Sequence, residues 1–244
     1  MGYKNRDVEV VSLNDTQYLV VACDSCGAIG EKELDLVKVP WWLTGKTTAR
    51  VALMEILAVG AAPQMLSVAI SNEPTPAGEE LLRGVREELE LVGLGSLPLA
   101  ISTEKNMPSR QTGLGITAIG ICEKERLRVG RSQPGHSLFC LGLPKVGNEA
   151  SDPNDPEIIQ CIHLLKLMAI PGVYDVIPVG SKGIRGEAEI LAHSIGTRLI
   201  IDAPANLDLD KSGGPSTCVI FTAKEDIKLK SLGQLPLHKI GKLE

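Results

Sequence analysis

The sequence predicts an α+β fold made of two successive units. In the first half, short β-rich apolar runs and helical patterns follow one another in the order strand, strand, helix, strand, helix, strand, strand. The same kinds of element recur after a charged segment at residues 123–134 that contains a turn. With 43% hydrophobic and 23% charged residues, the composition is that of a globular protein and excludes a disordered chain. We therefore expect an N-terminal domain at residues 1–125 and a C-terminal α+β domain at residues 126–244.

A β-hairpin opens the first half. Residues 7–13 alternate between polar and apolar side chains, and residues 18–23 form a continuous apolar run that leads to Asp24. Apolar positions at helical spacing then predict a buried helix with Thr44 as a possible N-cap and Gly60 as its stop. The remaining elements of this half are a strand, an amphipathic helix and two strands, at residues 65–70, 76–93, 97–102 and 114–122.

The second half has a similar composition of elements. A strand at residues 137–141 precedes a loop rich in Asp, Asn and Pro at residues 147–156. An apolar helix, a short strand, a second helix and two strands follow, at residues 157–169, 174–179, 184–195, 198–201 and 217–222. We find no residue-level repeat that relates the two halves.

Charge and hydropathy exclude several classes of partner. The chain has 30 acidic and 25 basic side chains and no long run of Lys or Arg, so the electrostatic signature of a nucleic-acid binder is missing. Apolar stretches are shorter than the roughly 20 residues that a bilayer span requires. The polar N-terminus lacks the apolar core of a signal peptide, which predicts a cytoplasmic protein with no membrane association.

Two short motifs give weak signals. Cys23 and Cys26 form a Cys-x-x-Cys, but no second pair completes a zinc site, so we expect reduced thiols without a metal or redox role. The run 45–48, Gly-Lys-Thr-Thr, is similar to the end of a phosphate-binding P-loop, yet Pro40 stands where that motif needs its first glycine. Lys46 can nevertheless contact a phosphate from near the N-terminus of the predicted helix.

Four carboxylates stand at ends of predicted strands or on the buried helix: Asp7, Asp24, Glu55 and Glu104. An isolated carboxylate in such a place is costly unless it is paired or bound to a cation. In one interpretation Glu55 is a buried acid satisfied by the backbone or by Arg50. In the other, the four acids converge on Mg²⁺ bound to nucleotide phosphates, because hard oxygen ligands suit that ion.

Several phrases resemble the ATP-binding, PurM-like superfamily of aminoimidazole ribonucleotide synthetase, which includes thiamine-monophosphate kinase, selenophosphate synthetase and a hydrogenase-maturation protein. The most specific phrase is Leu-Met-Glu-Ile-Leu-Ala-Val-Gly-Ala-Ala-Pro at residues 53–63, in which Glu55 takes a family Asp position. Residues 6–11, the strand ending at Asp24 and the strand ending at Glu104 also carry the resemblance. Within the superfamily, the chain is most similar to α-ribazole kinases, through residues 31–35, 103–106, 179–184 and 212–218.

The resemblance implies an ATP- and Mg²⁺-dependent small-molecule kinase that phosphorylates α-ribazole in cobalamin lower-ligand salvage. It implies a two-domain PurM-like fold, with an N-terminal sheet that pairs with a second copy into a dimeric β-barrel and a C-terminal α+β sandwich. On this reading Asp7, Asp24, Glu55 and Glu104 hold Mg²⁺. The nucleotide is bound by Asp24, Lys46, Arg50, Glu104 and Asn106, and the catalytic residues are Lys46 and Lys182.

Departures from the family pattern leave two other functions open. A paired Asp is reduced to Arg6-Asp7, a family Gly-Asp-Thr reads Thr103-Glu104, and Lys182 replaces the Asp of Ser-Asp-Gly. These changes are typical of a nucleotide-binding regulator or assembly protein that has lost turnover. The third possibility is an ATP-dependent synthetase of the aminoimidazole ribonucleotide or selenophosphate type, with Cys23 or Cys26 as the nucleophile.

Overall fold

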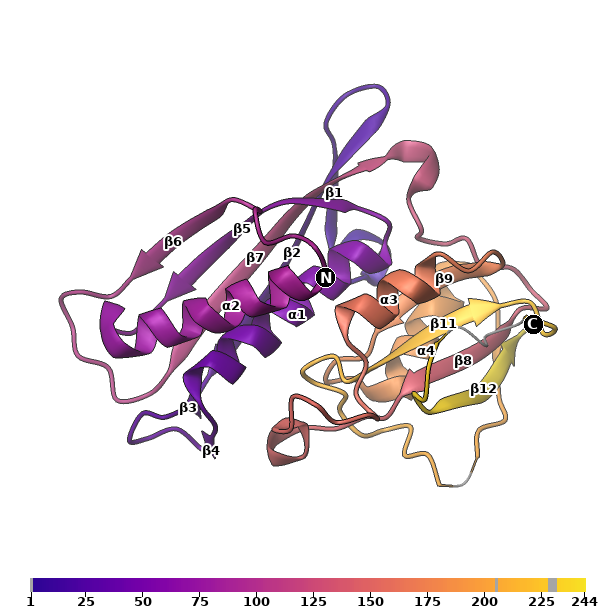
Figure 1. Ribbon diagram of the computed structural model, residues 1–244. Helices are drawn as coiled ribbons and strands as arrows, with labels where there is room; N and C mark the ends of the chain where they lie inside the picture. Colours follow the sequence, from indigo (N-terminus) through magenta and orange to yellow (C-terminus); the bar gives the residue numbers. More distant parts are fainter. Residues whose placement is uncertain (1, 205, 228–231) are drawn as a thin grey trace. The chain divides into compact units, whose positions relative to one another are not determined.

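The computed structural model describes residues 2–204, 206–227 and 232–244 (Figure 1). Its chain divides into two compact units. The N-terminal unit comprises Val8–Ile56 and Ala61–Glu123, and the C-terminal unit comprises Met1–Asp7, Leu57–Gly60 and Lys124–Glu244. Each unit combines a sheet with helices, which confirms the α+β fold class.

A five-stranded sheet of order β1-β2-β7-β5-β6 forms the base of the N-terminal unit. The predicted hairpin is present as the antiparallel pair β1 and β2, and β5 runs parallel to β6. A separate two-stranded pair, β3 and β4, lies in the loop that follows β2. The bounds are β1 Glu9–Ser12, β2 Gln17–Gly27, β3 Ile29–Gly30, β4 Val37–Lys38, β5 Ala62–Ile70, β6 Leu99–Thr103 and β7 Gly113–Glu123.

Helices α1 (Trp41–Ala58) and α2 (Glu79–Leu91) lie against one face of this sheet (Figure 1). Side chains of β7 alternate strictly between buried and half-buried, and Leu114, Ile116 and Ala118 are on the buried side. Because successive strand residues point to opposite faces, the core lies between the sheet and the two helices. The other face of the sheet is not covered by either helix.

The structure corrects the predicted start of α1. Thr44 is not the N-cap: the helix begins one turn earlier, at Trp41, directly after Pro40. The Trp41 indole donates a hydrogen bond to Thr112 Oγ1 at 2.9 Å and thereby anchors this extra turn. The predicted stop is correct, since Gly60 has φ +87° and the amides of Gly60 and Ala61 close the Schellman pattern on the last turn.

The C-terminal unit is built on an antiparallel sheet of order β10-β12-β8-β11-β9. Strand β12 was not expected from the sequence, in which glycine and two lysines interrupt its apolar positions. The bounds are β8 Ser137–Gly142, α3 Cys161–Met168, β9 Val173–Pro178, α4 Gly183–Ser194, β10 Leu199–Ile201, β11 Cys218–Ala223 and β12 Leu237–Leu243.

Helix α3 is shorter than predicted. The sequence predicts a helix from residue 157, but the Glu157 carbonyl accepts from Leu143 N and the Ile159 amide donates to Thr217 O. These bonds hold residues 157–159 in a non-helical path of turn and bend, so α3 begins only at Cys161. Local apolar content alone does not distinguish the two conformations.

Strands β8 and β11 are buried at every position, so both faces of this sheet are covered. Helix α4 packs on the face that carries Cys140, Cys218 and Ile220. The segment after β7 is not a loose linker within this unit, because the amides of Gly130 and Ser132 donate to the buried carboxylate of Asp175 at 2.8 and 2.7 Å.

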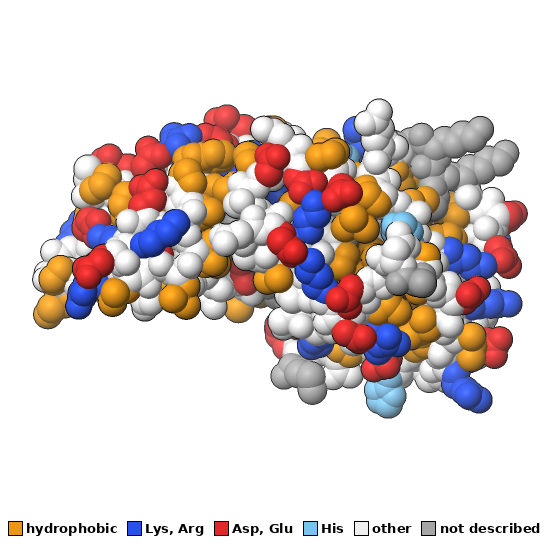
Figure 2. All heavy atoms as spheres, turned by 90° about the horizontal axis from the view of Figure 1, so that it is seen from below, with side chains coloured by type: hydrophobic (Ala, Val, Ile, Leu, Met, Phe, Trp, Pro, Cys, Tyr) orange, Lys and Arg blue, Asp and Glu red, His pale blue; other side chains and the backbone are white. Residues whose placement is uncertain are grey.

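Acidic and basic side chains are interspersed on the face drawn in Figure 2. Across the described ranges, no helix is both long and apolar enough to cross a membrane.

Candidate functional site

The predicted site residues are divided between the two units. Asp7 and Lys182 belong to the C-terminal unit, and the others, Asp24, Lys46, Arg50, Glu55, Glu104 and Asn106, belong to the N-terminal unit.

Asp24 lies near the end of β2, on the side of the strand that faces the helices together with the buried Val20 and Ala22. Burial raises the pKa of its carboxyl from 3.8 to about 6, and a hydrogen bond from the Ser25 backbone offsets only part of this effect. A partly dehydrated carboxylate of this kind is stabilised by a nearby cation. The position of Asp24 is therefore suited to the role that the sequence predicts.

Cys23 and Cys26 are free thiols inside the same strand. An odd separation places the two side chains on opposite faces of the sheet, so they cannot share a metal ion. Burial is the main reason that the pKa of Cys26 rises to about 11, although a hydrogen bond with Thr48 of α1 lowers it slightly. Cys26 is thus a protonated thiol at neutral pH and a poor nucleophile.

Glu55 and Arg50 are both buried on α1, with exposed fractions of 7% and 3%. Their burial confirms that α1 carries charged groups inside an otherwise apolar environment. A buried charged side chain can be a metal ligand or a partner in a structural ion pair, and burial is expected in both cases.

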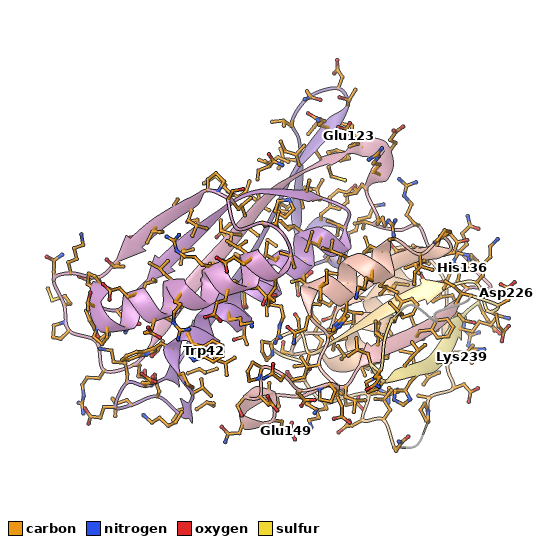
Figure 3. All side chains as sticks on the ribbon, in the orientation of Figure 1. Trp42, Glu123, His136, Glu149, Asp226 and Lys239 are labelled. Atoms are coloured by element: carbon orange, nitrogen blue, oxygen red, sulfur yellow. The ribbon has the colours of Figure 1, made fainter. Side chains whose placement is uncertain are left out.

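Lys46 is placed differently from the expectation. Since α1 begins at Trp41, Lys46 lies in the second turn and not at the helix N-terminus. Its ammonium is 5.9 Å from the centre of the Trp42 ring, and the Arg83 guanidinium is 5.4 Å from the same ring. Figure 3 labels Trp42 at the start of α1. Gly45 faces α2, where a Cβ would approach Leu81 O to 2.0 Å. The glycine therefore serves close helix packing, and the segment is not a phosphate-binding loop.

Glu104 follows β6 at the edge of the sheet. Its Oε1 accepts hydrogen bonds from the amides of Asn106 at 2.7 Å and Met107 at 3.2 Å. These bonds lower the pKa of the Glu104 carboxyl, which is ionised at neutral pH. The same loop brings Asn106 next to Glu104, so these two predicted nucleotide-binding residues lie together.

Two buried polar residues, Asp35 and Asn72, hold the loop that leads into β7, and neither was predicted as a site residue. Asp35 accepts from Lys32 N and from both the amide and hydroxyl of Thr112, at 2.7 to 2.8 Å. Asn72 donates to Gln111 O and accepts from Gly113 N. Both residues bond to the chain at the start of β7. A single Asp or Asn in a loop is too common in sequences to be recognised as such an anchor.

In the C-terminal unit, Lys182 immediately precedes α4 and lies near two carboxylates. Its Nζ is 3.7 Å from Asp7 Oδ2 and 3.5 Å from Glu187 Oε1. Glu187 is buried, and this burial raises the pKa of its carboxyl despite the nearby charge of Lys182. Glu187 is not among the residues predicted from the sequence, although the signal that identified Glu55, an acid on an apolar helix, is also present here.

Within the part of the chain that the structure describes, no group of three or more His, Cys, Asp or Glu side chains is placed to hold a metal ion. The predicted Mg²⁺ site at Asp7, Asp24, Glu55 and Glu104 therefore stays a prediction.

Comparison with known proteins gives a family match for the first half of the chain and a fold match for nearly all of it. Residues 5–122 match the family model of AIR synthase related protein, N-terminal domain. No curated protein matches the sequence.

Three solved structures illustrate the fold match. Thiamine-monophosphate kinase from Stenotrophomonas maltophilia has a TM-score of 0.66 and 17% identity, covering 98% of this chain and 89% of that chain. The corresponding kinase from Aquifex aeolicus has a TM-score of 0.66 and 14% identity, covering 98% and 88%. For T. maritima PurL complexed with AMPPCP, the TM-score is 0.63 at 12% identity, covering 97% of this chain and 37% of that chain.

Proposed function

We propose that this chain, whose first half matches the AIR synthase related N-terminal domain and whose fold is PurM-like, is an ATP- and Mg²⁺-dependent small-molecule kinase. The fold is shared with thiamine-monophosphate kinases over almost the whole length of both chains. A related structure of a thiamine-monophosphate kinase is complexed with AMPPCP and TMP, and one of PurL is complexed with ATP. These ligands make a nucleotide the first candidate here.

Asp24 is the observation that carries the proposal. Its carboxyl is partly dehydrated on the helix-facing side of β2, with a pKa of about 6. A bound divalent cation would favour the ionised form and offset the cost of burial. Carboxylate oxygen is the donor that Mg²⁺ prefers, so Asp24 fits this ion, with Glu55 and Glu104 of the same unit as further candidate ligands. Mg²⁺ would neutralise charge on the transferred phosphoryl group.

We propose α-ribazole as the phosphate acceptor. Two of the phrases that resemble α-ribazole kinases, residues 179–184 and 212–218, lie side by side in the C-terminal unit. The Gly213 amide donates to Gly180 O at 3.0 Å, and a Cβ on Gly213 would lie 2.8 Å from Val179 O. The contact supports a single binding surface formed by two segments that are distant in sequence.

A nucleotide-binding regulator is the second candidate. Lys182 stands where the resemblance predicts an acid, and its ammonium lies within 4 Å of Glu187 and Asp7, at 3.5 and 3.7 Å. A lysine there favours phosphate binding over metal binding. The synthetase alternative with a cysteine nucleophile is weaker, because the pKa of Cys26 is about 11.

We also propose a homodimer formed through the N-terminal sheet. On the face of the sheet that α1 and α2 leave uncovered, Val21 pairs with Ile119, and Ile119 pairs with Met65. This half-buried apolar row crosses three neighbouring strands. A second copy placed on it would bury the row and form the predicted barrel.

The test is an assay of purified protein with MgATP against α-ribazole, thiamine monophosphate and selenide, with ADP and AMP measured separately. The kinase proposal expects ADP formation that depends on α-ribazole. Formation of AMP and phosphate with selenide would instead support the selenophosphate-type synthetase. If MgATP raises the melting temperature but no acceptor yields product, the regulator is favoured. Absence of any thermal shift at millimolar MgATP would contradict both nucleotide-based functions.

A further inference from the structure

Lys182 and Glu187 form a pair at the start of α4. The side chain of Glu187 is 5% exposed, whereas that of Lys182 is 37% exposed. The ammonium is therefore accessible to solvent while one of its acidic partners is fixed inside the unit. Asp7, the other partner, is largely exposed.

Glycines lie at three positions around this pair, and close contacts require glycine at two of them, Gly186 and Gly183. At Gly186 a Cβ would lie 2.8 Å from Lys182 Cβ, so only glycine leaves room for the lysine side chain to lie along the helix. At Gly180 the nearest atom to a Cβ would be Glu187 Oε1 at 4.0 Å, so the carboxylate lies next to the loop backbone. Gly183 has φ +71°, and a Cβ there would be 2.8 Å from Leu209 O. The loop is thus held between α4 and the segment around Leu209.

The charged groups that face Glu187 come from two elements. Lys182 precedes the same helix, and Arg6 and Asp7 belong to the N-terminal segment. Arg6 is itself fixed, since its Nη2 donates to Val176 O at 2.6 Å. Lys182 is therefore the cation of the group that is open to solvent, and its Nζ lies 3.5 Å from Glu187 Oε1.

We infer that Glu187 is a positioning residue: it anchors the Lys182 ammonium beside the glycine loop at the α4 N-terminus, where the ammonium can bind a phosphoryl group. The identity of the ligand rests on the proposed function, whereas the anchoring of Lys182 by Glu187 does not. An ammonium at this place adds to the positive end of the helix, which favours phosphate. Glu187 does not touch the ligand in this arrangement and acts only through Lys182.

The first test measures anchoring without any ligand. Lys182 in the folded protein is acetylated with a limiting amount of an amine-specific reagent, and its rate of labelling is measured by mass spectrometry. Glu187→Gln should raise this rate about 2- to 5-fold, the range expected when an ion pair of partly exposed groups is removed. Glu189→Gln, the same change at an exposed position of α4, should leave the rate unchanged.

Gly186→Ala provides an independent variant that keeps Glu187 intact. Its methyl group would lie 2.8 Å from Lys182 Cβ, so the backbone that carries Lys182 must shift. Alanine is a better helix former than glycine, so α4 itself should be retained. The variant should accelerate labelling as Glu187→Gln does. If neither variant changes the labelling rate of Lys182, the inference is wrong. If Glu187→Gln does not fold, Gly186→Ala decides alone, and an unchanged labelling rate of Lys182 in that variant overturns the inference.

The second test links the anchor to turnover. With MgATP and α-ribazole, Glu187→Gln should lower kcat about 10-fold and change the KM for ATP less than 2-fold, because the lysine contact is made mainly in the transition state. If the parent protein turns over and Glu187→Gln has the same kcat, Glu187 does not position Lys182 for the reaction. If the parent protein has no turnover but its Lys182 labelling responds to both variants, the kinase proposal fails while the anchoring is upheld.

Discussion

Gly45 of α1 and Gly84 of α2 bring the two helices of the N-terminal unit into backbone contact. A Cβ on Gly45 would lie 2.0 Å from Leu81 O, and one on Gly84 would lie 1.7 Å from Trp42 O. Real Cβ atoms do not approach backbone atoms so closely, so any side chain at either position must push the helices apart. Because α1 carries Lys46, Arg50 and Glu55, the spacing of the helices also sets the position of these predicted site residues.

Gly84→Ala should destabilise the protein by about 2 kcal/mol, since overpacking outweighs the gain in helix propensity. Urea unfolding followed by circular dichroism measures the change. Gly27→Ala is the matched control, because a Cβ there meets nothing within 4 Å, and its effect should stay below about 0.5 kcal/mol. Equal stability of the Gly84 variant and the parent would show that α1 and α2 are not in close contact.

Asp24 should make stability depend on pH. Its folded pKa of about 6 exceeds the ordinary value of 3.8, so the folded state binds more protons than the unfolded state between these values. The free energy of unfolding therefore falls as the pH rises from about 4 to 6, by about 1–3 kcal/mol, and is flat above this range. Unfolding curves across this range should lose that slope in Asp24→Asn. A parent slope of opposite sign that persists in the variant would contradict the burial of Asp24.

Glu55→Gln separates metal binding from structural pairing. If Glu55 is a metal ligand, the amide keeps the size and hydrogen-bonding capacity of the side chain, and the variant folds but binds nucleotide with weaker Mg²⁺ dependence. We expect this result. A loss of about 3 kcal/mol or more in the free energy of unfolding, with unchanged Mg²⁺ dependence, would instead show that Glu55 is a structural ion-pair partner. Nucleotide titrations at several Mg²⁺ concentrations and urea unfolding measure the two quantities.

Ile119→Asp should convert the proposed dimer into a monomer. The substitution places a charge in the middle of the apolar row that joins β2, β7 and β5, where a partner sheet would bury it without a counterion. Light scattering coupled to size-exclusion chromatography should show the parent at twice the mass of the variant. Thr16→Asp, at an exposed position before β2, is a control that should leave the mass unchanged. A monomeric parent protein would refute the proposal.

Local patterns predict most elements because each element buries one face with a regular period. The alternation of β7 and the apolar run of β2 are examples, and Gly60 ends α1 where expected. Errors arise where distant contacts override the local pattern. Trp41 is helical because its indole reaches Thr112, and residues 157–159 are not helical because they bond to segments around Leu143 and Thr217.

The site is less predictable than the fold for the same reason. Asp24 could be identified from its place at the end of an apolar strand, and its raised pKa follows from that burial. Glu187 could not, since its importance depends on Lys182, on Asp7 and on the absence of a side chain at Gly186. Relations among residues that only the fold brings together are not encoded in any one motif.

Lys182 provides the sharpest test of the kinase proposal, because it stands where the resemblance predicts an acid. Its ammonium can neutralise charge on a transferred phosphoryl group, which an acid can do only through a metal ion. Lys182→Ala should therefore reduce kcat roughly 10²-fold with little change in ATP affinity. Arg185 lies on α4, and Arg185→Ala, which removes an exposed ion pair with Asp210 of the loop after β10, is a control that should retain turnover.

Lys182→Asp tests the same role with the opposite charge. A carboxylate at this position would lie beside the buried Glu187 and near Asp7, so like charges would repel and the pKa of Glu187 would rise further. We expect this variant to be at least as inactive as Lys182→Ala and less stable at pH 8 than at pH 5, since protonation of Glu187 relieves the repulsion. Steady-state kinetics and unfolding at both pH values measure these effects. Activity equal to or above that of the parent would mean that a metal-binding acid is the functional group here and that Lys182 has no catalytic role.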